Sequence, residues 1–376
     1  MAWSLPEFRL ATQLAEHEFA ARHHLGASDA QALTVDELLA LAGDDAPDLG
    51  AIRLSYGEQR GSDELRAVVA ATYDQLEVDD VLTFSGGSEA LFWALLELAG
   101  EDGHAVVTVP NYQPDEAVLL AAGVRVSPWP MDPARGWALD LDVLEALLRD
   151  DTRLVCVTVP HNPTGAVPDP GTMVALTELC DARGVRLLSD EVFRGIELDS
   201  ARTAPQAADL APTAVSIGAL AKAYGLPGLR IGWLAARDRR LLERIERRKQ
   251  YTSICNSPVT EVLGTIALAH REAVLRRNRG IVEDNLPRFA ATFATRAAAF
   301  AWEAPQGGCV SYPRYLGAEG VEAFCRALVH EAGVLVIPAS VFASELAPAP
   351  DDRFRVGLGR TGSAPALAAV EAFVDA

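Results

Sequence analysis

The stretch LAKAYGLPGLRIGW, residues 220–233, follows one short apolar run, 214–217, and leads into another, 231–235. Each run is typical of a buried strand, and the glycines and the proline between them predict a loop at a strand end. The loop carries Lys222, and Arg230 follows eight residues later. Because loops at strand ends of an α/β sheet expose reactive groups, the amine could form a Schiff base while the arginine binds a phosphate. A surface loop with two solvated cations is the alternative from these residues alone.

Lysine is rare in this chain. Of its 33 basic residues only Lys222 and Lys249 are lysines, so arginine serves wherever a generic surface cation is needed. A lysine that is retained in such a chain suggests amine chemistry, because arginine stays protonated and cannot form an imine. This composition supports a chemical role for the Lys222 amine.

Short β-branched runs alternate with amphipathic helical stretches on both sides of this loop. The expected strands are 105–109, 153–159, 185–189, 214–217 and 231–235. The expected helices are 89–99, 115–122, 141–148, 172–183 and 241–250. This βαβα pattern predicts an α/β fold with a mostly parallel central sheet, helices on both faces, and ligands at the carboxyl ends of the strands.

The rest of the chain predicts a second, smaller α+β domain. A long helical pattern runs from Ser257 through Arg296 with a bend at Pro287. Short strands are expected after it, at 309–315, 334–337 and 354–358. The first 45 residues have a mixed helical pattern and are expected to pack on this tail. We therefore predict a large domain over residues 46–280 and a small domain built from both chain ends, 1–45 and 281–376.

Composition excludes several classes of protein. With 376 residues, 49% of them hydrophobic, the chain can bury a large core, and its formal net charge of −19 disfavours nucleic acid and anionic membranes as partners. No stretch approaches the roughly 18 apolar residues that span a bilayer, and the start of the chain lacks a signal-peptide pattern, so a cytoplasmic protein is expected. The cysteines are five, odd in number and widely spaced, which predicts reduced thiols and no metal site.

Two polar residues follow expected strands. Asn162 precedes Pro163, which favours an extended backbone and aims the amide into the crevice above the sheet; a simple turn is the alternative. Asp190 ends the apolar run Leu187–Leu188 and would be partly desolvated, although such an aspartate usually caps a helix. Asp190 would have a chemical role instead if it faced a cationic group and stabilised the protonated form of that group.

Three more segments carry candidate binding residues. Gly87 and Ser88 lie in a glycine-rich turn between a strand and a helix, where free backbone N–H groups can bind a phosphate. Tyr112 follows a strand and could stack on a flat ring, or be an ordinary boundary aromatic. Arg355 lies in an expected strand of the small domain and could bind a carboxylate bidentately.

These elements occur in one order along the chain. Over nearly its whole length the chain resembles the fold-type I pyridoxal-phosphate enzymes of the class I/II aminotransferase family, through Asn162, Asp190, Lys222, Arg230 and Arg355 at family-like spacing. The resemblance implies an aminotransferase that uses pyridoxal 5'-phosphate and acts on an L-amino acid, with a keto acid as second substrate.

The resemblance also implies a role for each residue. Lys222 would form an imine with the cofactor, and Asp190 would pair with the pyridinium nitrogen. Asn162 would donate a hydrogen bond to the phenolic oxygen of the ring, and Tyr112 would stack on the ring. Arg355 matches the arginine that binds the substrate carboxylate.

The phosphate would be held by residues from two subunits. Gly87, Ser88 and Arg230 match the phosphate-binding residues of the family. Tyr56, in the segment LSYGEQRGSDELR, resembles the tyrosine that reaches the phosphate of the neighbouring subunit. A homodimer with shared active sites is therefore expected.

The chain departs from the family pattern at three positions. Phe193 stands where the family commonly has a tyrosine that donates to the phenolic oxygen, and Ala219 and Ala221 replace serines that often precede the lysine. Losing one phosphate hydroxyl would weaken cofactor binding by about 1.5–3 kcal/mol. Without the tyrosine hydroxyl, the protonated imine is favoured less or differently. Phe193 therefore counts against a simple transamination.

Two segments, 25–29 and 251–257, resemble a subgroup that includes capreomycidine-synthase-like enzymes. That subgroup implies an alternative function, a pyridoxal-phosphate-dependent lyase or cyclase that eliminates, replaces or cyclises at the β-carbon of an amino acid in specialised metabolism. A non-enzymatic scaffold is disfavoured, because the intact set of lysine, aspartate, asparagine and arginines has no use in one.

Overall fold

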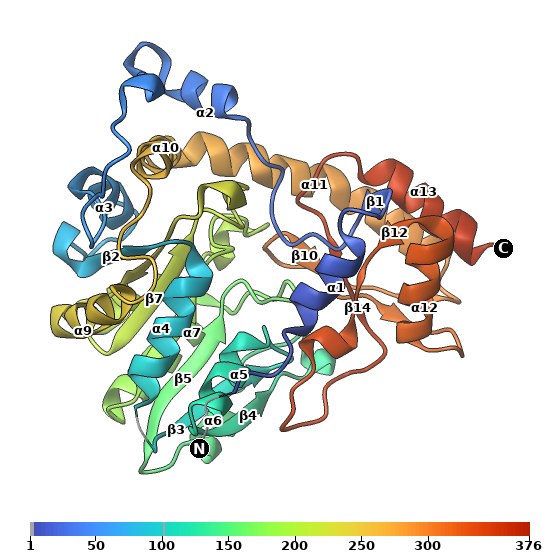
Figure 1. Ribbon diagram of the computed structural model, residues 1–376. Coiled ribbons are helices and arrows are strands. Elements are labelled where there is room, and N and C mark those ends of the chain that lie inside the picture. Colours follow the sequence, from blue (N-terminus) through green and yellow to red (C-terminus); the bar gives the residue numbers. More distant parts are fainter. Residues whose placement is uncertain (1–3, 101) are drawn as a thin grey trace.

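The computed structural model describes residues 4–100 and 102–376, and a seven-stranded sheet forms its centre (Figure 1). The strand order is β2-β8-β7-β6-β5-β3-β4. The strands are β2 (Val81–Phe84), β3 (His104–Val109), β4 (Arg125–Pro130), β5 (Thr152–Thr158), β6 (Arg186–Asp190), β7 (Ala214–Ala219) and β8 (Gly232–Ala235). Strand β8 is antiparallel to both of its neighbours, and the other neighbouring strands pair in parallel. The predicted α/β fold with a mostly parallel sheet is confirmed.

Strand β4 is absent from the expected set because of its prolines. Pro128 and Pro130 each remove a backbone N–H group, which is tolerated in a sheet mainly at its edge. Strand β4 is that edge and pairs with β3 alone.

Helices cover both faces of the sheet, as side-chain alternation in β5 requires. Leu154 and Cys156 point to one face and Val155 and Val157 to the other, each into its own apolar core. The first core is covered by α4 (Gly87–Ala99), α5 (Pro114–Ala121) and α9 (Arg239–Lys249). The second is covered by α6 (Leu141–Leu147), α7 (Pro170–Ala182) and α8 (Ala207–Leu210).

The C-terminal part forms a smaller α+β layer beside the sheet, on the right of Figure 1. Its helices are α11 (Arg271–Thr295), α12 (Val321–Ala327) and α13 (Ser363–Val374). Its antiparallel sheet has the order β10 (Val310–Ser311), β14 (Phe354–Gly357) and β13 (Ile337–Pro338). Strand β9 (Phe300–Ala301) pairs with β11 (Arg314–Tyr315).

The N-terminal residues pack on this layer, as expected, because β1 (His23–His24) pairs in parallel with β12 (Val334–Leu335). Helices α1 (Arg9–His17), α2 (Val35–Ala42) and α3 (Asp63–Ala70) complete the N-terminal part. Residue 280, the expected domain boundary, lies inside α11. The division into two domains stays a prediction.

Two details of the expected tail are wrong. The helical pattern after Ser257 is broken at His270, where φ is −105° and ψ is 24°, so α10 (Pro258–Ala269) ends before α11 begins. Pro287 lies inside α11, and the bend expected there stays a prediction. The expected strands are also divided: 309–315 forms β10 and β11, and 334–337 forms β12 and the start of β13. In each case the two parts pair with different partners.

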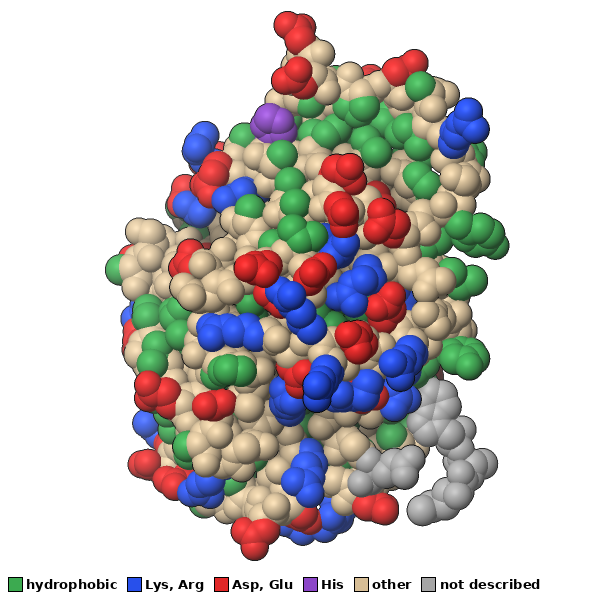
Figure 2. All heavy atoms as spheres, turned by 90° about the vertical axis from the view of Figure 1, so that its left-hand side faces the viewer, with side chains coloured by type: hydrophobic (Ala, Val, Ile, Leu, Met, Phe, Trp, Pro, Cys, Tyr) green, Lys and Arg blue, Asp and Glu red, His purple; other side chains and the backbone are tan. Residues whose placement is uncertain are grey.

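Charges of both signs intermingle on the face shown in Figure 2, which includes α9. Arg244 and Arg248 of α9 both pair with Glu97, and Arg239 pairs with Glu77 and Asp80. These arginines are therefore neutralised by neighbouring carboxylates. Among the residues described, no helix combines the length and apolar content needed to cross a bilayer.

Candidate active site

A cavity lies where the parallel strands of the central sheet end. All of the predicted site residues except Tyr56 line it, from five different strand ends and from β14. Its lining also includes Ser28, Thr158, Val192 and Leu10, which were not predicted. The carboxyl ends of parallel strands are where α/β sheets bind ligands, and the topology places the cavity there.

Asp190 and Lys222 form the polar base of this cavity. Asp190 is the last residue of β6, and its Oδ1 accepts a hydrogen bond of 3.1 Å from the Val192 amide. Burial raises the pKa of Asp190 to about 6, against the opposing effects of that hydrogen bond and of Lys222. Burial and the nearby Arg355 lower the pKa of Lys222, which Asp29 and Asp190 partly oppose. Both groups are thus pushed toward their uncharged forms.

Ser28 is the contact of Lys222 that the sequence did not reveal. Lys222 Nζ donates to Ser28 Oγ over 2.8 Å. Backbone bonds hold this segment in place, since the Ala30 amide donates to the Lys222 carbonyl (3.0 Å) and the Gly357 amide donates to the Leu25 carbonyl (2.6 Å). The resemblance carried by residues 25–29 is the sequence signal that points to this segment.

Arg355 lies in β14 and is only 2% exposed. Its Nη1 donates to Asn162 Oδ1 (3.0 Å) and its Nη2 to the Gly26 carbonyl (2.9 Å), whereas its Nε has no hydrogen-bond partner. The guanidinium lies 5.0 Å from the Phe342 ring centre, and burial lowers its pKa to about 10. No carboxylate within the described part of the chain forms an ion pair with it. A buried cation in this state can accept the carboxylate of a ligand.

A cradle of backbone and arginine lies at the start of α4. Gly86 has a φ of +97°, and a Cβ there would come within 2.2 Å of Arg230 Nη2, so the guanidinium lies directly against the turn. The first N–H groups of a helix have no partners within the helix. With Gly87 and Ser88 in the first turn, this cradle can hold a phosphate.

Tyr112 follows β3 and forms a wall of the cavity. Its ring packs edge-on against Phe8, with ring centres 5.6 Å apart. Burial raises its pKa to about 12, although a hydrogen bond with Ser88 opposes this. The ring is therefore held as a neutral aromatic beside the phosphate cradle.

The departures from the family pattern also face the cavity. Phe193, Ala219 and Ala221 all line it and present no hydroxyl. Tyr56 does not line it; its side chain is 85% exposed. The predicted role of Tyr56 belongs to a neighbouring subunit.

The family model for aminotransferase class I and II matches residues 26–369 of this chain. The chain belongs to that family. A capreomycidine synthase of Streptomyces vinaceus is 34% identical over 359 residues, covering 94% of this chain and 90% of the relative. A probable N-succinyldiaminopimelate aminotransferase, DapC, of Mycobacterium tuberculosis is 29% identical over 76% of this chain and 74% of its own length.

Solved structures agree with this assignment over the full chain. A PLP-dependent aminotransferase from Streptococcus suis matches with a TM-score of 0.92 and 28% identity, covering 99% of this chain and 98% of that one. The PLP-dependent cyclase OrfR matches with a TM-score of 0.90 and 26% identity, with the same coverage. The protein is a pyridoxal-phosphate-dependent enzyme of the aminotransferase family.

The residues of the cavity fit this cofactor. The absence of a Cβ at Gly86 lets the Arg230 guanidinium lie against the turn, which places a cation beside the first N–H groups of α4. Asp190 keeps one carboxylate oxygen free of any bond to the Val192 amide, and a protonated ring nitrogen would stabilise its charge. Lys222 is the lysine that lines the cavity.

Proposed function

We propose that this protein is an aminotransferase that moves the amino group of an L-amino acid to a keto acid, with Lys222 as the residue that holds the cofactor covalently. One observation carries the proposal: the buried, unpaired guanidinium of Arg355 lies in the same cavity as Lys222 and Asp190. A substrate carboxylate bound at Arg355 would bring its Cα over that pair.

Each residue has a distinct task in this proposal. Pyridoxal phosphate, when bound, supplies an electron sink for the bond that breaks at the substrate Cα. Burial and Arg355 favour the neutral amine of Lys222, which can take the Cα proton and return it. Asp190 would hold the ring nitrogen protonated, and Tyr112 would cover one face of the ring.

Asn162 links the substrate side of the site to the cofactor side. Its Oδ1 accepts from Arg355, which leaves its Nδ2 group free to donate to the phenolic oxygen of the cofactor ring. The same amide would therefore orient both the arginine that binds the substrate and the ring beside it.

A lyase or cyclase is the second candidate function. The similarity to capreomycidine synthase and to the cyclase OrfR supports it, as does Phe193, which removes one donor that favours simple transamination. The Ser28 hydroxyl on Lys222 Nζ adds a second group that could move a proton near the β-carbon.

Product analysis separates these candidates. The cofactor-loaded protein is incubated with a panel of L-amino acids, with and without pyruvate or 2-oxoglutarate, and products are identified by mass spectrometry. A keto acid that forms only with an acceptor supports the aminotransferase. Ammonia or a cyclised product that forms without an acceptor supports the second candidate, and no product from any amino acid contradicts both.

We also propose a homodimer whose active sites are completed across the interface. Tyr56 is 85% exposed and does not line the cavity of its own chain, as expected of a residue that acts in a neighbouring subunit. Leu54 and Tyr251 are also large, apolar and exposed, and such side chains favour an interface. Sedimentation at micromolar concentration tests this: a fully active monomer would contradict it.

A cytoplasmic location is part of the same proposal. All five cysteines are free thiols, as is usual in a reducing compartment. Fractionation of the producing cell with an antibody to the protein would test it, and recovery from the medium would contradict it.

A further inference from the structure

Arg360 is a second arginine close in sequence to Arg355, and the proposed function does not use it. It follows the end of β14 at Gly357, and its side chain is 38% exposed, whereas Arg355 is buried. Its backbone is held by α11, because the buried Asn285 donates from Nδ2 to the Arg360 carbonyl over 2.9 Å. The guanidinium therefore extends from a fixed point of the fold.

The partner of this guanidinium is Asp29. Arg360 Nη2 donates to both carboxylate oxygens of Asp29, each over 2.9 Å. The Asp29 side chain is only 13% exposed, so the carboxylate is the more deeply buried member of the pair. A Cβ at Gly359 would come within 2.7 Å of the Asp29 carbonyl, so the glycine lets the two segments touch. A buried carboxylate is costly without such a cation.

The segment that carries Asp29 also contacts both functional cations of the active site. Ser28 Oγ accepts from Lys222 Nζ over 2.8 Å, and the Gly26 carbonyl accepts from Arg355 Nη2 over 2.9 Å. Asp29 therefore lies beside a contact of each. Burial lowers the pKa of Lys222, as Arg355 does, and burial lowers that of Arg355. Asp29 is the group that most strongly opposes this lowering at both.

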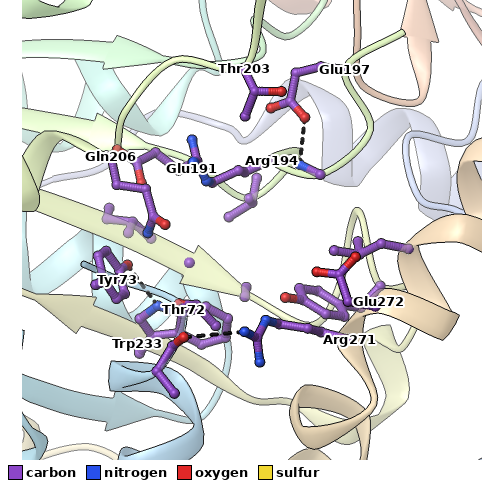
Figure 3. A pocket seen from close by; sticks show the side chains of 18 of the residues that line it. Thr72, Tyr73, Glu191, Arg194, Glu197, Thr203, Gln206, Trp233, Arg271 and Glu272 are labelled. Carbon is purple, nitrogen blue, oxygen red and sulfur yellow. Dashed lines mark hydrogen bonds between the residues drawn. The ribbon is translucent and has the colours of Figure 1, made fainter. Parts of the chain in front are cut away.

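A nearby acid in the sequence does not share this position. Glu191 follows Asp190 directly, but it lines a second cavity together with Arg194 (Figure 3). Burial raises the pKa of Glu191, and Arg194 opposes this. Glu191 and Arg194 therefore act on each other, and Asp29 and Asp190 are the carboxylates that act on Lys222.

His24 cannot take the place of Arg360 as the cation of the pair. Burial lowers the pKa of His24, and so does Arg360, whereas Glu18 and Asp29 oppose this. His24 Nε2 also lies 3.4 Å from Glu18. Because its pKa is below the ordinary value, His24 is mainly neutral at neutral pH. Arg360 is therefore the group that neutralises Asp29 there.

Loss of the guanidinium would leave the carboxylate of Asp29 without its cation. A carboxylate near an amine favours the charged amine, so the ammonium form of Lys222 would be stabilised. The same carboxylate would offset the charge of Arg355 and weaken the attraction of that guanidinium for a substrate carboxylate.

We propose that Arg360 is a positioning residue of the active site, which pairs with Asp29 and so keeps that carboxylate from Lys222 and Arg355. Lys222 thereby retains a neutral amine, and Arg355 stays open to the carboxylate of the substrate. The proposal rests on the proposed function, which assigns these tasks to Lys222 and Arg355.

The pH dependence of lysine acylation tests the proposal without turnover. Cofactor-free protein is treated with acetic anhydride over a range of pH, and peptide mapping gives the extent of reaction at each lysine. In Arg360→Met the pKa of Lys222 should rise by about one unit, the lower end of the effect of a nearby opposite charge. Lys249, measured in the same samples, should keep its profile.

A second substitution separates positioning from a purely structural role. Arg360→Met combined with Asp29→Asn lacks the unpaired carboxylate, so the pKa of Lys222 should return to the original value or fall below it. Structural damage would not be reversed in this way. The matched control is Arg314→Met, which removes a 45% exposed arginine from its pair with Asp352, outside the lining of the active-site cavity, and should leave Lys222 unchanged.

Substrate binding gives a second readout. With an amino acid that yields product, KM should rise about 10-fold in Arg360→Met, the factor equivalent to one pKa unit, and should recover in the double variant. An unchanged Lys222 profile in Arg360→Met, or a shift that Asp29→Asn does not reverse, would overturn the proposal. Arg360→Gln replaces Arg360→Met if the latter fails to fold. Absence of product from every amino acid would contradict the proposed function alone, because the acylation profile still decides the role of Arg360.

Discussion

The two lysines of this chain lie in two buried regions with different electrostatic surroundings. Lys222 lines the active-site cavity and donates to the Ser28 hydroxyl. Lys249, at the end of α9, is 0% exposed, donates to the Gln59 carbonyl, and lies 5.7 Å from the centre of the Phe84 ring. Burial is the main cause that lowers the pKa of each. Burial alone therefore does not distinguish them.

A neighbouring cation makes the difference. Arg355 lowers the pKa of Lys222 further, against the opposing effects of Asp29 and Asp190, whereas Lys249 has no such cation beside it among the residues that the structure describes, and Glu89 and Glu261 raise its pKa. An amine beside a buried cation favours its neutral, nucleophilic form, and an amine among carboxylates favours its charged form. The comparison teaches that Lys249 is a structural cation, which holds the segment around Gln59, and that Lys222 is suited to covalent chemistry.

The largest expected effect is that of Lys222→Ala. The substitution removes both the attachment point and the base, so kcat should fall by at least about 10²- to 10⁴-fold. Stability should change little, because the lost amine has one hydrogen bond. Borohydride reduction of the unmodified protein, followed by peptide mapping, should place the cofactor on Lys222; a label on Lys249 would reverse the comparison.

Arg355→Met should make the surroundings of Lys222 more like those of Lys249. The lost carboxylate contact is worth about 1.5–3 kcal/mol, so KM should rise roughly 10- to 150-fold. In the cofactor-free protein, the pKa of Lys222 should rise as well, measured by the pH dependence of its acylation rate. An unchanged acylation profile would show that Arg355 is not what lowers that pKa.

The central sheet and its order of motifs could be predicted because buried parallel strands give continuous apolar runs that end in polar residues. Strand β4 could not, since Pro128 and Pro130 contradict a strand until its edge position is known. The break at His270 was missed because no glycine or proline marks it. Local sequence patterns indicate the propensity of a segment for helix or strand, and tertiary packing decides which structure the segment adopts.

The candidate site also has a part that the sequence predicts and a part that only the folded structure shows. Asp190, Asn162 and Lys222 follow strands, so the parallel sheet brings them together wherever the rest of the chain goes. Ser28 is nearly 200 residues from Lys222 in sequence, and only the packing of the N-terminal segment on β14 unites them.

Lys249→Met tests the structural side of the comparison. It leaves the Gln59 carbonyl without its donor and Glu89 and Glu261 without their cation, so the free energy of unfolding should fall by about 1–3 kcal/mol. Urea unfolding measures this. Lys222→Met is the matched control and should be less destabilising; equal losses would mean that the two lysines contribute alike to stability.

The smallest expected effect lies at Phe193, on the catalytic side of the comparison. Phe193 is buried and lines the active-site cavity, where it offers no hydroxyl to the phenolic oxygen of the cofactor. A tyrosine there would donate a hydrogen bond to the anionic form of that oxygen and so lower the pKa of the cofactor linkage in Phe193→Tyr. A hydrogen bond to a charged group exceeds a neutral one by about 1–1.5 kcal/mol, and one pKa unit is about 1.4 kcal/mol, so the shift should be about one unit or less. The pH midpoint of the cofactor's absorption change measures it.

Phe92→Tyr, outside the lining of the active-site cavity, is the control and should leave the midpoint in place. A midpoint equally unchanged in Phe193→Tyr would mean that another donor already binds the phenolic oxygen, and Asn162 is the first candidate to test.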